Sequence, residues 1–446
     1  MNGRMRSLIF TLLFFAVCLV PAAGLALGAE SKAGANEVLA VRPVLIKRDG
    51  TPNGDYLRDL ADYVGDRFFL RREAVTARAK LSAALFRTSV TEDVILGSGG
   101  WLYYAPTLGD YTRTERMSAR EIWCAARTLY QLQENVESRG GRFLFTIAPN
   151  KNTLYSEAMP VYPVADGPSN AEALREVLSG MGVHTADLFT AFAKEDDILY
   201  FPTDSHWNGA GAALAADTIL SALDIESDYF AGPFADGTHK GDLYEMLYPA
   251  GTDLDPDPTY APGFRFTANT TNPDNARIRA QGPGVGSLFL YRDSFGRNLY
   301  PYLAESFAES EFSRRNEYDP SVLPEDGALV IELVERNLRY LNEYTHPVPA
   351  PLRDAELVAG AADRGRIAVS TEDGTAFSGS FTDVRPDDDS PVYLAAGGTV
   401  YEAIPKPDGF TAILPEGISS RDLRVVFVSD GVLVSLSAAD DLISGG

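Results

Sequence analysis

The chain has 446 residues, which is enough for two or three domains, and 45% of them are hydrophobic. Its formal net charge of −23 argues against binding to nucleic acid or to an anionic membrane surface, because such binding relies on lysine and arginine. The two cysteines, Cys18 and Cys124, nearly exclude a zinc site built from cysteine and histidine. The composition is that of a globular protein for which no metal and no cofactor is expected.

Residues 1–29 have the layout of a secretory signal. Arg4 and Arg6 precede an apolar run from Leu8 to about Val20, and small residues follow. The whole apolar span is also about long enough to cross a bilayer, so an uncleaved membrane anchor is the alternative. Both interpretations place the bulk of the protein outside the cytoplasm, either secreted or anchored by this segment.

The next two segments lead into the first domain. Residues 30–54, which begin with a small and polar stretch, are interpreted as a linker. Residues 55–95 are interpreted as the N-terminal helical part of the domain, because residues such as Leu57 and Leu60 recur at helical spacing. The four residues GSGG at 97–100 stand between apolar runs and predict a tight hairpin.

The middle of the chain alternates between short apolar runs and helical patterns. Runs such as RFLFTIAP, GSLFLYRD and GALVIELVER are typical of buried strands, and stretches such as SNAEALREVLSGMG and GAGAALAADTILSALD are typical of helices. This alternation predicts an α/β domain over residues 55–346 with a doubly wound parallel sheet. In such sheets the functional residues gather outside the carboxyl ends of the strands.

A proline-rich linker at residues 347–354 separates this domain from a region of different texture. Residues 355–446 hold short apolar runs between glycine, proline and aspartate, and they predict a small antiparallel β-domain of the sandwich type. This domain is interpreted either as a packing or spacer module or as a carbohydrate-binding module. In the second case Tyr393, Tyr401 or Phe410 would contact the sugar.

Ser294 lies where the apolar run LFLY ends and a helical pattern begins, so it is either a turn serine or a nucleophile presented at a strand end. An activated serine needs a base, and histidine is the usual one because its pKa lies near neutrality. The chain has four histidines: His184, His206, His239 and His346. His206 differs from the others because it lies between a strand-like run and a helix, with Asp204 two residues before it.

In an extended backbone residues i and i+2 point to the same side, so Asp204 can reach His206 Nδ1 and leave Nε2 free for a serine. The alternative is that Asp-x-His is a chance pattern and that Asp204 caps the next helix. Both motifs lie at strand-to-helix junctions of a chain with few histidines, which favours a catalytic site. His184 is interpreted as structural, His346 as part of the linker, and His239 as a surface residue with a substrate contact left open.

Two motifs, TDSHWNGAGA at 203–212 and YRDSFG at 291–296, together resemble the SGNH-hydrolase-like proteins of the alginate O-acetyltransferase type, including the DHHW proteins. In that family an Asp-x-His-Trp motif precedes the serine motif, the reverse of ordinary SGNH esterases, as in a circular permutation. The resemblance covers about residues 55–345, and the stretches GSGGWLYY, IAPNKNTLY, GDLYEML and VIELVERNL follow in the expected order. This chain departs from the family at Ser205 and Arg292, where relatives often carry Thr or His and Gly, respectively.

The resemblance implies an SGNH-like α/β fold and acyl transfer through an acyl-serine. Ser294 would be the nucleophile, His206 the general base and then the general acid, and Asp204 the carboxylate that orients the imidazole. Asp293 is expected to support the turn by hydrogen bonding.

The helix after Ser294 would aim backbone N–H groups at the oxyanion, and Asn150 or Lys151 is placed for a second donor, with an ordinary loop as the alternative. Arg292 puts this geometry in question, because a glycine there would let the backbone approach the substrate more closely. Trp207 and Trp101 complete the candidate binding residues. The first would shield the His–Asp pair from water, and the second would line a sugar-binding face unless it belongs to the core.

The expected function is that of an exported O-acetyltransferase acting on hydroxyls of a cell-surface or secreted polysaccharide. Its expected partners are that polysaccharide and a membrane-bound O-acyltransferase that donates the acetyl group, with no nucleic acid. The same triad serving water would make the protein a carbohydrate acetylesterase. The third alternative is a non-catalytic glycan-binding or assembly protein, in which the α/β domain is only a scaffold.

Overall fold

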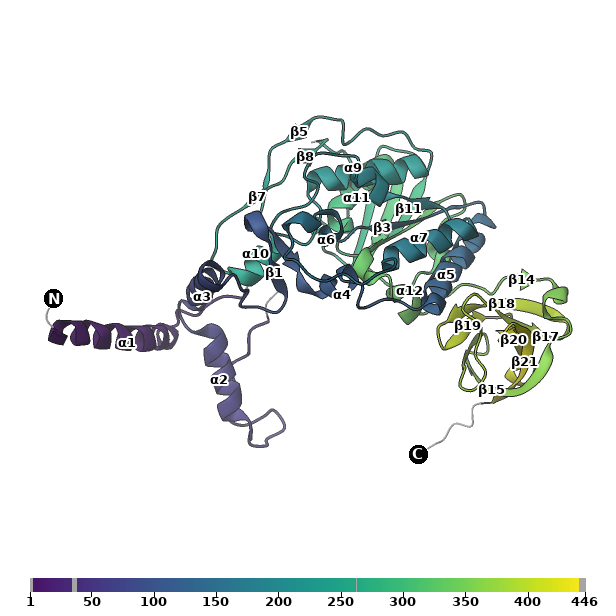
Figure 1. Cartoon of the computed structure of the whole chain (residues 1–446), viewed down its shortest axis with the longest axis horizontal. Helices are drawn as coiled ribbons and strands as arrows, with labels where there is room; N and C mark the ends of the chain where they lie inside the picture. Colours follow the sequence, from purple (N-terminus) through teal and green to yellow (C-terminus); the bar gives the residue numbers. More distant parts are fainter. Residues whose placement is uncertain (1–2, 34–37, 262, 441–446) are drawn as a thin grey trace.

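The computed structural model describes residues 3–33, 38–261 and 263–440, so the outermost parts of the predicted segments 1–29 and 355–446 and four residues of the predicted linker 30–54 lie outside the described residues. Helix α1 (Gly3–Ala26) extends away from the rest of the protein (Figure 1). Its stretch Arg4–Ala26 is long and apolar enough to cross a membrane, and none of it is buried in the protein.

The predicted helical part consists of two helices rather than one. Helix α2 (Tyr56–Arg67) and helix α3 (Arg71–Phe86) are separated by a corner in which Leu70 has a φ of 65°. Two strands follow, β1 (Val94–Leu96) and β2 (Leu102–Tyr104), and their antiparallel pairing confirms the predicted hairpin.

The α/β domain is built on a seven-stranded sheet in the order β4-β3-β13-β11-β12-β10-β9, which confirms the predicted fold class. The strands are β3 (Arg142–Ala148), β4 (Thr185–Ala186), β9 (Thr267–Ala268), β10 (Arg277–Gln281), β11 (Ser287–Tyr291), β12 (Glu309–Ser313) and β13 (Ala328–Val334). The first five strands of that order are parallel, whereas β10 and β9 are antiparallel to their neighbours. The sheet is therefore parallel at its centre and mixed at one edge.

Helices cover both faces of this sheet, as a doubly wound fold requires. One face packs against α5 (Ala119–Glu137), α7 (Asn170–Met181) and α12 (Tyr340–Glu343), and the other against α8 (Leu188–Phe192), α9 (Gly209–Ala222) and α11 (Gly296–Ser306). Helices α5 and α7 each begin with a capping box, in which Ser118 pairs with Glu121 and Ser169 with Glu172. As the sequence predicts, Asn208 caps α9 by accepting a hydrogen bond from Gly211 N–H.

Short elements surround the carboxyl edge of the sheet, where β3, β11 and β13 end. They are helices α4 (Leu108–Tyr111), α6 (Lys151–Leu154) and α10 (Asp242–Leu247) and the strand pairs β5 (Phe234–Ala235) with β8 (Thr259–Tyr260) and β6 (Thr238–His239) with β7 (Asp255–Pro256). Helix α10 packs against α3 and the β1–β2 hairpin through a small apolar cluster that includes Leu243, Leu247 and Ala79. The N-terminal elements therefore support the edge on which the candidate site lies.

The C-terminal region is a β-domain, as predicted, but it is a closed barrel rather than a sandwich. Its strands are β14 (Leu352–Arg353), β15 (Ala362–Glu372), β16 (Ala376–Ser380), β17 (Val392–Ala396), β18 (Thr399–Lys406), β19 (Gly409–Ile413), β20 (Arg424–Ser429) and β21 (Val432–Asp440). Seven of them close into one sheet because β18 pairs with both β17 and β19, while β14 adds to β18 at the side. Strand β15 runs parallel to β21, so the barrel is not wholly antiparallel.

The aromatic residues considered for sugar binding lie largely inside this barrel. Tyr401 and Phe410 belong to its apolar core, with 9% and 1% of their surface exposed, and Tyr393 is half-buried. Closure turns alternate side chains of each strand inward, which is where Tyr401 and Phe410 point. These two residues are therefore core residues, as the packing interpretation expected.

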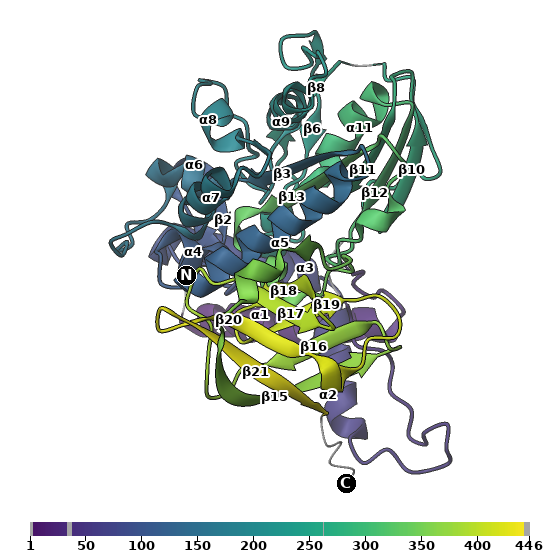
Figure 2. The same ribbon diagram turned by 90° about the vertical axis from the view of Figure 1, so that its right-hand side faces the viewer.

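Helix α5 lies between the sheet and the barrel (Figure 2). Its outer face carries Arg127, whose guanidinium donates to the fully buried Glu402 of β18 at 2.6 and 2.7 Å. Gln131 on the same face donates to the Ala403 carbonyl at 3.1 Å. Arg353 of β14 donates to Glu402 from the other side at 2.6 Å, so this carboxylate holds both domains together.

Candidate active site

Ser294, His206 and Asp204 form one line of hydrogen bonds at the carboxyl edge of the sheet. The Oγ of Ser294 lies 2.8 Å from His206 Nε2, and Asp204 Oδ1 lies 2.7 Å from His206 Nδ1. With the carboxylate ionised, Nδ1 carries the proton and Nε2 is free to accept one from the serine. Ser294 is half-buried and the His206 side chain is 21% exposed, so a substrate can reach the end of the line.

The turn that presents Ser294 is held by Asp293. One carboxylate oxygen of Asp293 accepts the Phe295 N–H at 2.9 Å, and the other accepts the Val334 N–H at 2.7 Å and Asn337 Nδ2 at 3.0 Å. Because Val334 ends β13, these bonds connect the turn after β11 to the neighbouring strand. Asp293 thus supports the turn, as the sequence led us to expect.

Glu332 lies beneath this turn and has no exposed surface. Its Oε2 accepts the Asp293 N–H at 3.3 Å. Burial, reinforced by the nearby Asp293 charge, raises the pKa of Glu332 well above its ordinary value. The sequence reads as an apolar strand at this position and gave no sign of a buried acid.

Asp204 is saturated with hydrogen bonds. Its Oδ1 accepts the backbone and ring N–H groups of His206 at 2.9 and 2.7 Å, and its Oδ2 accepts His239 Nε2 and the Asp242 N–H, both at 2.8 Å. Burial by itself raises the pKa of Asp204, but the bonds from His206 and His239 outweigh it and hold that pKa well below the ordinary value. The orienting carboxylate is therefore ionised at neutral pH.

Asp242 reinforces the same corner. It begins α10, and its Oδ1 and Oδ2 accept the backbone N–H and the hydroxyl of Ser205 at 2.8 and 2.7 Å. Its Oδ2 also lies 3.7 Å from His206 Nδ1. Ser205, one of the two departures from the family pattern, is thus a hydrogen-bonded part of the site.

Asp204, His206 and Asp242 also have possible ligand atoms within 4.8 Å of one another, close enough for a metal ion. Each oxygen of Asp204 already accepts two N–H groups, and an ion would have to displace some of them. The donor set therefore matches proton transfer along the line better than metal binding.

The structure does not place Lys151 as an oxyanion donor. Its ammonium is buried and donates to the carbonyls of Phe201, Pro202 and Asp204 at 3.1, 3.0 and 2.6 Å. An ammonium has three donors, so all are used inside the protein. Burial lowers the pKa of Lys151 to about 7, while the three carbonyls favour the charged form. Lys151 fixes the loop that carries Asp204.

Asn150 is not placed as an oxyanion donor either. It is buried, its backbone N–H donates to Glu335 at 2.9 Å, and its Nδ2 donates to Asp110 at 2.9 Å. Burial raises the pKa of Glu335 to about 7 and that of Asp110 to about 6. The sequence correctly predicted that Asn150 follows a strand. It did not show the direction of the side-chain amide, which points into a network of acidic side chains.

Arg292 points away from the site. Only 2% of it is exposed, and its Nη2 donates to the carbonyls of Pro273 and Asn275 at 2.7 and 3.1 Å. A Cβ on Gly296 would lie 2.5 Å from the Arg292 side chain, so the stem of this arginine covers the first turn of α11. Arg292 is a packing residue of the turn, and the expectation that it borders the oxyanion is not met.

The two tryptophans contact the site from inside the protein. Trp207 is fully buried, and its Nε1 donates to the Phe295 carbonyl at 3.1 Å, which joins the histidine motif to the serine motif. It shields the site as a core residue and does not contact substrate. Trp101 is half-buried, its ring lies 4.8 Å from that of Tyr155, and the Lys151 ammonium lies 5.6 Å from its centre. A sugar contact at Trp101 stays a prediction.

The sequence missed two further residues beside the triad. His239, expected on the surface, binds Asp204, and only its place in the stretch THKGDL hinted at a role. Arg336, just after β13, lies over the ring of Phe295 at 5.4 Å and over that of Tyr104 at 5.5 Å. Its position after a strand end was the available signal.

The other two histidines serve structure. His346, placed in a linker by the sequence, is buried and stacks on Tyr318 at 4.7 Å. Burial lowers its pKa to about 3, so it is neutral. His184 is exposed and lies 3.1 Å from Glu137.

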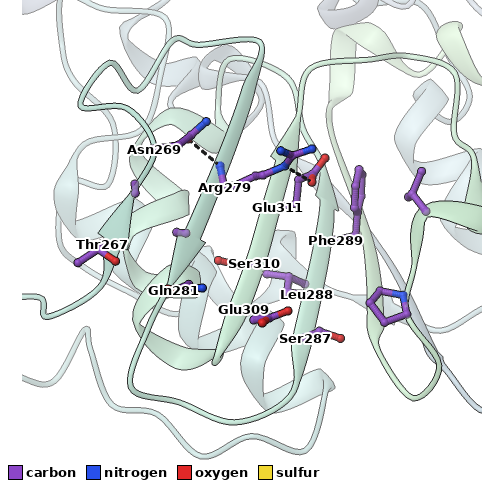
Figure 3. Close-up of a pocket in the computed structure, with 14 residues that line it drawn as sticks. Thr267, Asn269, Arg279, Gln281, Ser287, Leu288, Phe289, Glu309, Ser310 and Glu311 are labelled. Atoms are coloured by element: carbon purple, nitrogen blue, oxygen red, sulfur yellow. Dashed lines mark hydrogen bonds and ion pairs between the residues drawn. The ribbon is translucent and has the colours of Figure 1, made fainter.

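A hollow of about 500 Å³ lies on the face of β9, β10, β11 and β12 (Figure 3). Arg279 pairs with Glu311 there at 3.0 Å, and Asn269 accepts the Arg279 N–H at 2.9 Å. In the described part of the chain, the residues that line the hollow include no member of the triad. We assign this hollow no role.

Comparison with known proteins identifies the domain. Residues 94–281, which contain Asp204 and His206 and end before Ser294, match the model of a family described as the SGNH hydrolase-like domain of the acetyltransferase AlgX. A probable alginate O-acetylase AlgJ from Pseudomonas syringae pv. tomato is 24% identical over 244 residues, which are 52% of this chain and 58% of that protein. The probable alginate O-acetylase AlgJ from Pseudomonas aeruginosa is 24% identical over 264 residues, 56% of this chain and 63% of that protein.

The chain therefore spans less than two thirds of either curated relative. Among solved structures, the O-acetyltransferase domain of Pseudomonas putida AlgJ is similar with a TM-score of 0.37 and 16% identity, covering 55% of this chain and 92% of that one. The matched family model and the two relatives agree with the motifs that the sequence displays. The resemblance of these motifs to the SGNH-hydrolase-like proteins of the alginate O-acetyltransferase type is thus confirmed by a family match over residues 94–281 and by two distant relatives.

Proposed function

We propose that the protein is an exported O-acetyltransferase that moves an acetyl group through an acyl-serine to hydroxyls of a cell-surface or secreted polysaccharide. The observation that carries this proposal is the continuous line from Ser294 through His206 to Asp204, with contacts of 2.8 and 2.7 Å. Such a line lets a base withdraw the serine proton and later return it to the leaving group. The relatives described as alginate O-acetylases support acetyl as the transferred group.

In the first half of the reaction, Ser294 Oγ attacks the acetyl carbonyl while His206 Nε2 takes its proton. His206 then gives that proton to the donor's leaving group as its bond to the acetyl carbon breaks. The new negative charge on the carbonyl oxygen needs N–H donors. The Phe295 N–H is already used by Asp293, so the N–H groups of Ser294 and Gly296 are the nearest candidates along the chain. Their place at the start of α11 adds the favourable end of the helix dipole.

In the second half, a sugar hydroxyl gives its proton to His206 and attacks the acetyl-serine. The ester bond to Ser294 then breaks, and His206 returns the proton to Ser294 Oγ. Water in place of the sugar would give acetylesterase activity from the same intermediate. We assign the second half to transfer because the relatives are described as O-acetylases. The proposed partners are therefore the polysaccharide that accepts the acetyl group and a membrane-bound O-acyltransferase that donates it.

Export is part of the same proposal. Helix α1 is apolar and long enough to cross a membrane, which agrees with a signal or an anchor at this end of the chain. An anchored protein would work beside a donor that lies in the same membrane. The acetyl group would then pass from the donor to Ser294 and from Ser294 to the glycan.

Intact-protein mass spectrometry with an acetyl ester such as 4-nitrophenyl acetate tests the intermediate. We expect one added acetyl group on the wild type, none on Ser294→Ala, and wild-type labelling on Ser287→Ala, a serine at the other end of β11. Unlabelled wild type would support a non-catalytic role.

A second measurement separates transfer from hydrolysis. Adding an acceptor oligosaccharide to the acetylated enzyme should yield acetylated sugar in place of free acetate. Release of acetate alone, at the same rate with and without the sugar, would establish the esterase alternative. Glycans from cells that carry Ser294→Ala should lose acetyl groups if the reaction proceeds as proposed.

A further inference from the structure

We propose that His239 is a positioning residue for Asp204 and, through it, for the general base His206; this inference rests on the proposed function. His239 Nε2 lies 2.8 Å from Asp204 Oδ2, on the side of the carboxylate opposite His206. Ser294, His206, Asp204 and His239 thus form a line of four side chains. The second histidine does not touch the reacting atoms and acts through the carboxylate.

The hairpin of β6 and β7 grips the loop of Asp204 at two adjacent residues. His239 and Asp255 lie opposite each other in this hairpin. While His239 binds Asp204, Asp255 Oδ2 accepts both the backbone N–H and the hydroxyl of Thr203 at 2.8 Å. The cross-strand pair of His239 and Asp255 therefore holds the consecutive residues Asp204 and Thr203. These two contacts fix the position and the orientation of the Asp204 carboxylate.

The segment after β6 comes close enough to complete this grip. A Cβ on Gly241 would lie 2.2 Å from the Thr203 carbonyl oxygen, so no larger residue is accommodated there. This close approach lets the Asp242 N–H reach Asp204 Oδ2 at 2.8 Å beside His239. The ring of His239 in turn packs on Phe201, with ring centres 4.4 Å apart, and its side chain is 25% exposed.

The charges around His239 favour its bond to Asp204. The charged groups that face His239 are Asp204 on the loop, Asp257 after β7 and Arg297 on α11. Burial lowers the pKa of His239, but the bond to Asp204 outweighs it, and the net pKa is raised.

The test compares His239→Ala, which removes the donor, with His239→Gln, whose amide can donate from nearly the same place. We expect His239→Ala to lower kcat for 4-nitrophenyl acetate about ten- to a hundredfold, the range for losing one hydrogen bond to a charged group, with KM little changed. His239→Gln should restore most of kcat. Rescue by an amide donor at this position, with KM unchanged, distinguishes positioning of Asp204 from a merely structural role.

His184→Ala is the matched control, since the His184 side chain is exposed and its ring contacts Glu137. Thermal unfolding of all variants shows whether His239→Ala folds, and His239→Gln keeps the proposal testable if it does not. Wild-type kcat in His239→Ala would overturn the proposal, as would a folded His239→Gln whose kcat is as low as that of His239→Ala. Failure of the proposed function is distinct, because wild type itself would then form no acetyl-serine.

Discussion

At the carboxyl edge of the central sheet, Glu332 and Glu335 are buried without a cation bonded to either carboxylate, and burial raises the pKa of both. In the described part of the barrel, Glu402 is the only buried charged side chain, and two arginines bind it. Burial by itself would raise the pKa of Glu402, but Arg127 and Arg353 outweigh it and the pKa is lowered. Burial by itself raises the pKa of all three glutamates, but the net pKa is raised for Glu332 and Glu335 and lowered for Glu402.

The difference between these pKa shifts indicates where the protein tolerates the energetic cost of burying an acid. A buried acid without a cation destabilises the fold or takes up a proton, and a protein tolerates it where the group is useful. A buried acid that is paired with arginines holds two parts of the protein together rigidly, because removing either partner leaves an uncompensated charge. The sheet edge is therefore arranged for chemistry, and the contact of α5 with the barrel is arranged for rigidity.

The largest expected effect is a loss of kcat, and it comes from a variant at the carboxyl edge of the sheet. Asp204→Asn keeps the shape but cannot accept four N–H groups, and it favours the wrong tautomer of His206. We expect kcat to fall about 10³- to 10⁴-fold, the size seen when the orienting carboxylate of a triad is lost. The measurement is turnover of 4-nitrophenyl acetate. Asp187→Asn, which weakens the cap of α8, is the control and should leave kcat unchanged.

The contact between α5 and the barrel should affect stability rather than catalysis. Glu402→Ala leaves Arg127 without its acid and Arg353 with Glu134 alone, and the two arginine side chains are each only 18% exposed. We expect the free energy of unfolding to fall by about 3–5 kcal/mol, with kcat unchanged below the unfolding transition. Urea unfolding and turnover together check this. A large loss of kcat at an unchanged unfolding midpoint would break the comparison between the two regions.

Glu335→Gln sharpens the comparison through pH. The pKa of Glu335 in the folded protein, about 7, lies above its unfolded value, so its contribution to stability is full below about pH 4.5 and is lost as pH rises through 7. Glutamine does not titrate, so the variant should gain roughly 1–3 kcal/mol relative to wild type between pH 5 and pH 8. Urea unfolding at both pH values measures the gain. An equal difference at both would show that Glu335 is ionised throughout.

An uncharged contact at the same edge gives the smallest effect. Trp207→Phe removes the hydrogen bond to the Phe295 carbonyl that joins the two catalytic motifs. We expect a loss of about 1–2 kcal/mol in stability and a several-fold loss in kcat, because the His206–Ser294 distance is less firmly held. Trp123→Phe, outside the site on α5, should change kcat little. The same measurements apply.

Much of the sheet domain could be predicted because its signals are local. Apolar runs such as those of β3, β11 and β13 give strands, and serine caps such as Ser118 and Ser169 give helix starts. The approach of Ser294 to His206 agrees with the expected strand-to-helix junctions, but only Ser294 follows a strand of the sheet, β11. The strand-like run before His206 forms no strand of that sheet and makes a single bridge between Tyr200 and Trp207. Barrel closure was not predictable in this way, because the β18–β19 pairing leaves no mark on the spacing of short apolar runs.

The site beyond the triad could be predicted only in part. Sequence position put Asn150, Lys151 and Arg292 after strand ends, but the direction of each side chain depends on partners far along the chain, such as Asp110 and Pro273. His239 was missed for the same reason. Its partner lies 35 residues away, and a turn-rich loop gives no periodicity from which to infer a contact.

Because Arg292 packs on Gly296, the residue at 292 limits which residue can stand at 296. An added Cβ at residue 296 would lie 2.5 Å from Arg292 Cδ and 2.6 Å from its Cβ. Alanine is better than glycine inside a helix by about 1 kcal/mol, yet here the exchange is blocked while the arginine is present. A glycine at 292 would remove both of these atoms, whereas an alanine would keep the Cβ at 2.6 Å. The order of substitutions matters at this turn, and a change at 292 must come before one at 296.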